Sequence, residues 1–180
     1  MKETIKRSVE LSAGVSAHVN GAIVNIKGPK GEVQREFVHP KVKITLEENK
    51  IVLVAEKGTK REKTIIGAFR SHIRNMVQGV KELHLYKLKV CSGHFPMTVT
   101  VSGHEFIIKN FLGEAVARKA QIVPGVIVKV EGNDVTVTSA DLEAAGLTAA
   151  RIENLCRITN RDKRIFQDGC YIVQKPGQNL

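Results

Sequence analysis

The sequence repeats itself, and this repetition constrains the possible folds more than any other feature. Matching residues recur in the same order in both halves, so chance does not explain the set. The matches are Val19-Asn20-Gly21 with Val101-Ser102-Gly103 and Ile26-Lys27 with Ile108-Lys109 (both displaced by 82), Gly31-Glu32 with Gly113-Glu114 (82), Glu47-x-Asn49 with Glu131-x-Asn133 (84), and Gly67, Ile73 and Asn75 with Gly146, Ile152 and Asn154 (79). Small drifts in displacement are what loop insertions produce. The sequence therefore predicts two tandem copies of one unit, residues 1–84 and 85–180.

The first copy has the pattern of antiparallel strands followed by a helix. Apolar and polar residues alternate between positions 17 and 55, as in half-buried strands. Turns are expected at Asn20-Gly21, which favours positive φ at both positions, and at Glu48-Asn49. The period then changes to three and four over residues 66–80, which predicts an amphipathic helix.

The second copy has a similar pattern. Strands are expected near residues 97–101, 105–109 and 115–118, followed by a hairpin that turns at Gly132-Asn133. A helix from about Ser139, capped by Ser139 or Asp141, precedes a final strand over 170–173. The connection 81–96 contains few flexible residues, so we expect it to be stiff and to contribute a strand. We predict an α+β fold: two homologous domains, each an antiparallel sheet packed with one main helix.

Composition points to a polyanionic partner. The chain carries 28 Lys+Arg against 18 Asp+Glu, a net charge of +10 and a pI near 9.7. Phosphates attract such a surface, and release of their counterions favours binding. A basic surface without a particular partner is the alternative. No apolar run could span a membrane, the charged N-terminus differs from a secretion signal, and three cysteines without a CxxC pair suit a reducing cytosol.

Other motifs carry little chemistry. Cys91, His94 and His104 could suggest a metal, but structural zinc needs four ligands, so we expect none. Gly28-Pro29-Lys30-Gly31 superficially resembles a phosphate loop; a turn between strands is the better interpretation, although Lys30 could still touch an anion. No nucleophile–base or paired-carboxylate motif is present, so we expect no enzyme activity and no cofactor. Ion pairing is the simpler role for Asp162 and Asp168.

A basic segment follows the second helix. It places Arg157, Arg161, Lys163 and Arg164 within eight positions, where guanidinium groups suit phosphate oxygens. A solvated loop is the alternative. Net charge instead favours the first half of the chain as the binding region. Residues 1–86 carry 16 basic and 9 acidic groups (+7), whereas residues 87–180 carry 12 and 9 (+3). We give clustering more weight, because a nucleic-acid footprint needs its cations on one surface. The basic segment 57–63 is similar but less organised.

The chain resembles a known family over nearly its whole length. The matching segments are Arg164-x-Phe166-x-Asp168-Gly169-x-Tyr171-Ile172-x-x-Lys175, Pro124-Gly125-Val126, Ala149-Ala150-Arg151-Ile152-Glu153, Lys87-Leu-Lys-Val with His94-Phe95-Pro96, and Asn110-Phe-Leu-Gly-Glu. These are similar to the universal large-subunit ribosomal protein six family (protein nine in eukaryotes), in its archaeal or eukaryotic form. Cys170 departs from the usual aliphatic residue but is a small hydrophobe. The end of the chain soon after Lys175 favours the archaeal form.

The resemblance implies a structural component of the cytoplasmic large ribosomal subunit. It implies binding to large-subunit ribosomal RNA, mainly through the second domain, near the sarcin–ricin region and the stalk base. Neighbouring ribosomal proteins would be partners and translation factors would dock nearby; the family has no membrane partner, cofactor or reaction. Carried over by position, the principal RNA contacts are Arg157, Arg161, Lys163, Arg164 and Lys175, followed by Arg118 and Lys119.

Two alternatives come from other classes of protein. A free-standing interaction module would use its basic faces to bind acidic protein partners. An enzyme would need a pocket in which polar groups have perturbed pKa values.

Overall fold

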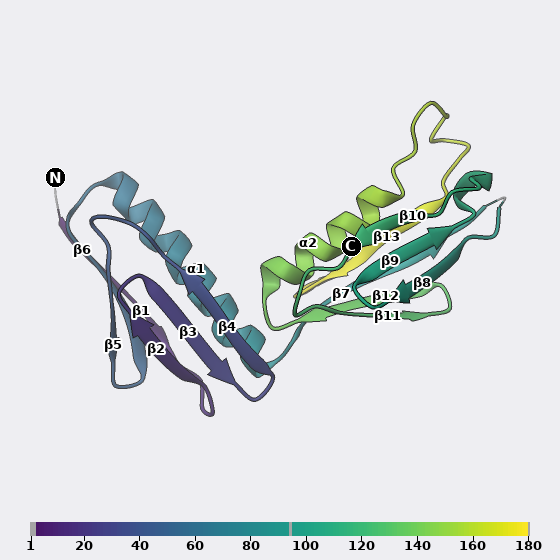
Figure 1. Cartoon of the computed structure of the whole chain (residues 1–180). Helices are drawn as coiled ribbons and strands as arrows, with labels where there is room; N and C mark the ends of the chain where they lie inside the picture. Colours follow the sequence, from purple (N-terminus) through teal and green to yellow (C-terminus); the bar gives the residue numbers. More distant parts are fainter. Residues whose placement is uncertain (1–2, 94, 180) are drawn as a thin grey trace. The chain divides into compact units, whose positions relative to one another are not determined.

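The structure is a computed structural model, and it describes residues 3–93 and 95–179. The chain divides into two compact units, Met1–Leu83 and His84–Leu180 (Figure 1). Each unit combines antiparallel sheets with one long helix, which confirms the α+β prediction. The strands of each unit are divided between two sheets.

The first unit contains two three-stranded sheets and one helix. Its elements are β1 (Glu3–Glu10), β2 (Ser16–Asn20), β3 (Ile23–Gly28), β4 (Gly31–Glu36), β5 (Lys43–Glu47), β6 (Lys50–Gly58) and α1 (Lys60–Lys81). One sheet has the order β1-β6-β5 and the other the order β2-β3-β4, with antiparallel pairing throughout. Helix α1 contacts strands of both sheets.

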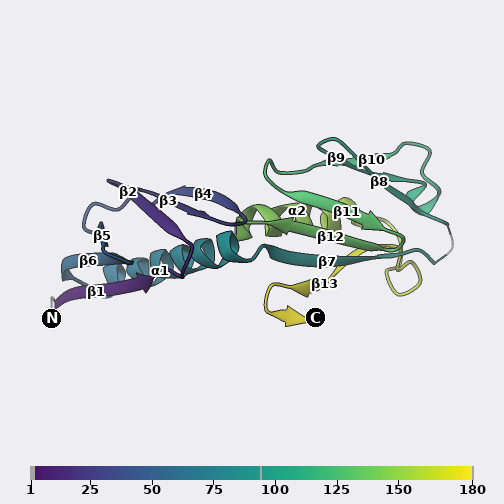
Figure 2. The ribbon, with the colours of Figure 1, turned by 90° about the horizontal axis from the view of Figure 1, so that it is seen from below.

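The second unit repeats this plan and extends it. Its elements are β7 (His84–Cys91), β8 (Thr98–Ser102), β9 (Glu105–Lys109), the 3₁₀ turn η1 (Phe111–Gly113), β10 (Arg118–Gln121), β11 (Ile127–Glu131), β12 (Asp134–Ser139), α2 (Leu142–Leu155), β13 (Gly169–Lys175) and β14 (Gln178–Asn179). The sheet orders are β10-β9-β8 and β11-β12-β7-β13-β14. In Figure 2 the two sheets of this unit form separate layers. The order β11-β12-β7 reproduces β5-β6-β1, and β13 and β14 are added beyond β7.

The apolar stripe of each helix is buried against these sheets. In α1, Ile66, Ile73 and Val80 are fully buried, and in α2 Ala145, Ala149 and Ile152 are fully buried. Side chains from both sheets of a unit meet at its helix, because α2 contacts β10 of one sheet and β7, β12 and β13 of the other. The helix is therefore the common packing surface of each unit.

Most hairpin turns lie where the sequence predicts them. Glu47 pairs with Lys50 and Glu131 with Asp134, so the two-residue loops are the expected ones. The turn at Asn20-Gly21 is wrong by one residue, because Asn20 pairs with Ile23 and remains in its strand. The loop is Gly21-Ala22, with positive φ at the glycine only. A glycine at the first loop position suits the twist of such hairpins.

Three other predictions need adjustment. The strand expected near residues 115–118 begins at Arg118, because residues 111–113 form η1 before it. Asp141 rather than Ser139 caps α2, and its carboxylate accepts a hydrogen bond from the Glu143 N–H at 2.9 Å. Strand β1 was not anticipated, since its Lys, Arg and Glu residues mask the alternation. The expected strand in the connection exists as β7.

Gly28 lets the β3–β4 turn pack against the end of α1. A Cβ at Gly28 would lie 2.7 Å from the Val80 carbonyl oxygen, closer than atoms can approach. The same carbonyl accepts a hydrogen bond from the Lys30 N–H at 3.0 Å. Gly28 and Gly31 are paired across the strands, which confirms that this segment is a turn between strands.

We expect Gly28→Ala to lower the free energy of unfolding by about 1–3 kcal/mol, because the new methyl group has to displace backbone atoms of α1. Denaturant titration followed by circular dichroism measures the change. Gly67→Ala is the matched control. Its methyl group would meet nothing within 4 Å, and alanine in a helix is favoured over glycine by roughly 0.5–1 kcal/mol. Equal effects of the two substitutions would contradict this account of Gly28.

Candidate nucleic-acid interface

The basic segment predicted from the sequence forms the loop between α2 and β13, residues 156–168. In Figure 1 this loop extends beyond the ends of both elements. The structure places Arg157, Arg161, Lys163 and Arg164 on it, and all four side chains are exposed. The four predicted cations are therefore brought together on one projecting loop.

Buried side chains anchor both ends of this loop. Cys156 and Ile158 enter the core at its start, and Asp168 is buried at its end. The Asp168 carboxylate accepts a hydrogen bond from the Gly93 N–H, two residues beyond the end of β7. Asp168 is therefore a backbone anchor, and the ion pair expected there stays a prediction. Anchors at both ends hold the intervening cations in a defined place.

Asp162 organises the tip of the loop. Its carbonyl accepts hydrogen bonds from the Ile165 and Phe166 N–H groups at 3.1 and 2.9 Å. Its carboxylate accepts from the Arg164 N–H at 2.9 Å and from the Arg164 guanidinium at 2.8 Å. This pairing lowers the pKa of Asp162 and confirms the expected ion pair. It also engages part of the hydrogen-bonding capacity of Arg164, whose side chain is 90% exposed.

A hollow lies beside the loop. Arg157, Lys163, Phe166 and Tyr171 help to line it, and its volume is about 370 Å³. The Arg161 guanidinium lies over the Phe166 ring, 5.0 Å from its centroid. Cations beside aromatic rings can bind a phosphate and stack on a base.

Sequence reasoning missed Phe166 and Tyr171 as site residues. Tyr171 is 42% exposed, and its hydroxyl donates to the Gln167 carbonyl at 3.2 Å. A Cβ at Gly169 would come within 3.1 Å of the Tyr171 ring, so the glycine leaves room for it. The signal was available: in a strand that begins at Gly169, alternation places Tyr171 outside while Cys170 points into the core.

Arg118 holds the base of the loop. Its guanidinium donates to the carbonyls of Leu155 and Arg157, at 2.7 and 3.2 Å. It also forms a two-point ion pair with Glu114, at 2.8 and 2.6 Å, which lowers the pKa of that carboxyl. The Phe111 ring lies 4.2 Å below the guanidinium. Arg118 thus joins β10 to the end of α2 and to the second residue of the loop.

The segment Asn110–Glu114 shapes this contact. Asn110 and Leu112 adopt left-handed backbone conformations, with φ of 59° and 49°, and Gly113 follows at 80°. Such backbone is costly for Leu112, so surrounding contacts have to maintain it. It places Phe111 and Glu114 around one guanidinium, which gives this family-like segment a structural purpose.

Two predicted cations lie away from the loop. Lys119 is on β10, where its ammonium pairs with Glu105 at 3.1 Å across the sheet. Lys175 ends β13, six residues beyond Gly169, and is therefore roughly 20 Å along the strand from the loop. Both are exposed, but the structure does not bring them together with the four loop cations.

The described residues hold no cluster of three or more potential metal ligands. His94 lies outside the described part of the chain. Cys91, Cys156 and Cys170 are free thiols, and Cys170 is buried as expected. The Cys156 pKa is lowered chiefly by its hydrogen bond with Cys170. Among the residues described, neither helix has the length and apolar character needed to cross a membrane.

Comparison with known proteins gives a family match in both units. A family model described as Ribosomal protein L6 matches residues 11–83 and 95–169. The relatives are archaeal proteins named Large ribosomal subunit protein uL6. The one from Methanospirillum hungatei is 42% identical over 97% of this chain and 99% of its own length. Those from Aeropyrum pernix and Methanococcus vannielii are 45% and 43% identical, over 93% and 98% of this chain and 92% and 97% of their own lengths.

We expect Arg118→Ala to destabilise the protein by about 1–3 kcal/mol, because the Leu155 and Arg157 carbonyls lose their donor. Amide hydrogen exchange should accelerate between residues 157 and 166, which reports loosening of the loop. Lys119→Ala is the control on the same strand. It breaks only an exposed ion pair, so stability should change by no more than about 0.5 kcal/mol. Unchanged exchange in the Arg118 variant would contradict the assigned contact.

The Glu114 pair should also make stability depend on pH. Its folded pKa is lowered by Arg118, so the contribution is present above the unfolded pKa, about 4.3, and is lost as pH falls through the folded value. We expect wild type to exceed Glu114→Gln in unfolding free energy at pH 7, and the difference to shrink below about pH 4. A difference that grows on acidification would contradict the assignment.

Proposed function

The chain belongs to the ribosomal protein L6 family, and we propose that it binds large-subunit ribosomal RNA through the loop between α2 and β13. Its role is that of a structural, non-enzymatic constituent of the large ribosomal subunit, which places it in the cytoplasm. One observation supports the loop above all: a projecting segment anchored at both ends presents four exposed cations.

The loop cations differ in how freely they can bind phosphate. Arg157, Arg161 and Lys163 have no ion-pair partner among the described residues, whereas Arg164 is paired with Asp162. Unpaired exposed cations bind phosphate without first losing a carboxylate. We therefore assign the leading contacts to these three, with Arg164 contributing through its exposed charge.

The remaining predicted residues have different roles in this proposal. Arg118 positions the loop, since its guanidinium is already occupied by Glu114 and two carbonyls. Lys119 has to exchange its Glu105 partner for a phosphate. Lys175 is a separate contact at the other end of β13. Phe166 and Tyr171 add surfaces on which an unpaired base could stack.

The resemblance described above suggests where on the subunit the loop acts. We propose that it contacts RNA near the sarcin–ricin region and the base of the stalk. Neighbouring ribosomal proteins would then be partners, and translation factors would dock nearby. Crosslinking of the intact subunit, mapping the nucleotides that meet residues 151–175, would test this placement.

The loop is tested by charge reversal in the full-length protein. We expect Arg161→Glu with Lys163→Glu to weaken binding to in vitro transcribed large-subunit RNA at least roughly a hundredfold, because phosphate contacts become repulsive. Binding is measured across a salt titration, since each lost phosphate contact reduces the salt slope by about one. The matched control is Lys109→Glu with Lys129→Glu, which makes the same charge change on strands of the same unit.

Equal loss in the loop variant and its control would show that binding depends on net charge, and the loop assignment would fail. The rival function, a free-standing module for acidic protein partners, predicts a different distribution in the cell. Absence of the protein from large subunits sedimented in low salt would favour that rival.

A further inference from the structure

The two units differ at one edge of their corresponding sheets. In the second unit, β13 pairs with β7 and contacts α2, so the space beside the helix is filled. In the first unit, β1 corresponds to β7 and is the edge of its sheet; no described strand pairs with its outer side. A strip of surface between β1 and α1 is therefore open where the second unit carries an additional strand.

Residues on this strip can be matched between the units. The helices align at a displacement of 79, which pairs Gly67 with Gly146. On the strands, Arg7 pairs with Leu53 and Tyr86 pairs with Val137, so Arg7 occupies the place of Tyr86. In the second unit the Tyr86 hydroxyl lies 3.0 Å from a Cβ built at Gly146; at Gly67 nothing lies within 4 Å.

The matched helix positions have changed character. Where α2 has Leu142, Ala149 and Glu153, α1 has Lys63, Arg70 and Arg74. Ala149 is fully buried, and the Glu153 carboxylate accepts a hydrogen bond from the Ile172 N–H of β13 at 3.1 Å. Their counterparts Arg70 and Arg74 are exposed. The positions that support a strand in one unit are thus cationic in the other.

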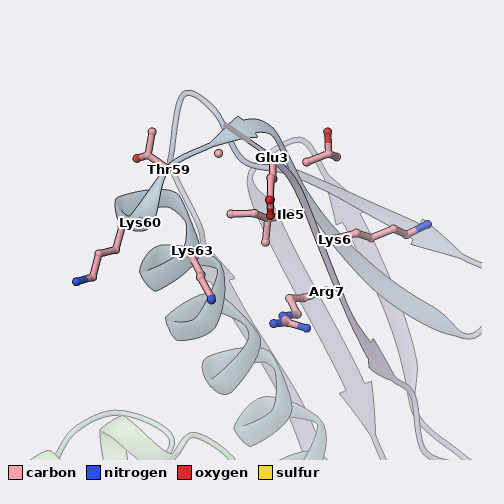
Figure 3. A pocket seen from close by; sticks show the side chains of 9 residues that line it. Glu3, Ile5, Lys6, Arg7, Thr59, Lys60 and Lys63 are labelled. Carbon is pink, nitrogen blue, oxygen red and sulfur yellow. The ribbon is translucent and has the colours of Figure 1, made fainter. Parts of the chain in front are cut away.

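These cations form one groove, which we call the β1–α1 groove. Its helical part is lined by Arg7, Lys63, Gly67, Arg70, Ser71 and Arg74, and it continues past Lys60 at the start of α1. Figure 3 shows Lys63 and Arg7 on facing sides of the space between helix and strand, while Lys6 points away. From Lys63 to Arg74 the helix rises by about 16 Å.

No ion pair within the described residues neutralises the groove cations, although one acid, Glu3, helps to line the stretch beside Lys60 (Figure 3). Among the described residues, Arg7, Lys63, Arg70 and Arg74 make no ion pair, whereas Lys6 pairs with Glu47 on another face. Helix α1 contains six Lys and Arg residues and one acid, Glu62. That carboxylate is buried and turned toward Thr59 and Lys41; its hydrogen bonds with Thr59 lower its pKa to about 2.

We propose that the β1–α1 groove is a second RNA-binding surface, which holds successive phosphates of an RNA backbone. Lys63, Arg70 and Arg74 lie on one face of α1, and Arg7 faces them from β1. Groups of this kind bind phosphate oxygens without reading sequence. The proposal rests on the proposed RNA-binding role but concerns a different unit and different residues.

A protein partner fits the groove less well. In the second unit β13 contacts α2 at Glu153, so a strand added to β1 in the same way would meet Arg74 and bury its guanidinium group. The residues that line the helical part of the groove include no apolar side chain apart from the stems of Lys and Arg. Protein interfaces depend on aromatic and apolar anchors and are depleted in lysine.

The test compares two double variants of the full-length protein, with in vitro transcribed large-subunit RNA as the probe. Arg70→Ala with Arg74→Ala removes two charges from the groove. Arg61→Ala with Lys81→Ala removes two charges from the same helix outside the groove. We expect the groove variant to lose about tenfold or more in affinity and about two from the salt slope, and the control to stay within about twofold. Arg70→Lys with Arg74→Lys should retain most of the affinity.

Each outcome bears on one proposal. If the loop variant loses RNA affinity and the groove variant binds RNA normally, the groove proposal is overturned and the proposed function stands. Normal binding by both overturns the proposed function. If the groove variant binds RNA normally but loses a neighbouring protein on reconstitution of the subunit, the groove is a protein site and this inference is wrong. Circular dichroism melting of each variant separates loss of binding from loss of fold.

Discussion

Burial of one helix against strands from two antiparallel sheets holds each unit together. Ile73 of α1 and its counterpart Ile152 of α2 are both fully buried. The helices differ at two other matched positions, where the buried Ile66 corresponds to Ala145 and the exposed Arg70 to the buried Ala149. The difference follows from what surrounds the helices. Strand β13 contacts α2, so small side chains let strand and helix pack closely, whereas the equivalent side of α1 is open. The presence or absence of one strand beside the helix thus determines which side chains fit on that side of the helix.

Local sequence signals predicted much of this architecture. Signals from neighbouring residues are enough to predict the repeat, both helices and the turns at Glu48-Asn49 and Gly132-Asn133, so these features can be found without the fold. The turn at Asn20-Gly21 was misplaced by one residue, because Gly21 suits the second position of an Asn20-Gly21 loop and also the first position of a Gly21-Ala22 loop. Strand β1 escaped notice because it is an edge strand whose exposed face is charged. The alternation that identifies a half-buried strand is weak in such a segment.

The candidate sites show a similar limit. The clustered loop cations are adjacent in sequence, so the sequence placed them together. Arg118 holds the loop from 39 residues away, through backbone carbonyls that no side-chain pattern reveals. The cations of α1 were counted as net charge but not recognised as a stripe, although Lys63, Gly67, Arg70 and Arg74 have the spacing of one helical face. These side chains line a groove only because β1 lies opposite them, and only the fold shows where β1 lies.

The net charge of a unit does not show which of its cations can bind a phosphate. The second unit has the smaller net charge, and three of its seven predicted contacts, Arg118, Lys119 and Arg164, are paired with carboxylates. Its advantage is a loop that holds Arg157, Arg161 and Lys163 in place. Among the described residues the groove cations of the first unit have no ion-pair partner, and the one acid of α1 is turned inward. Duplication therefore produced two copies of one scaffold, and divergence at the edge beside each helix determined whether a strand or a row of cations lies there.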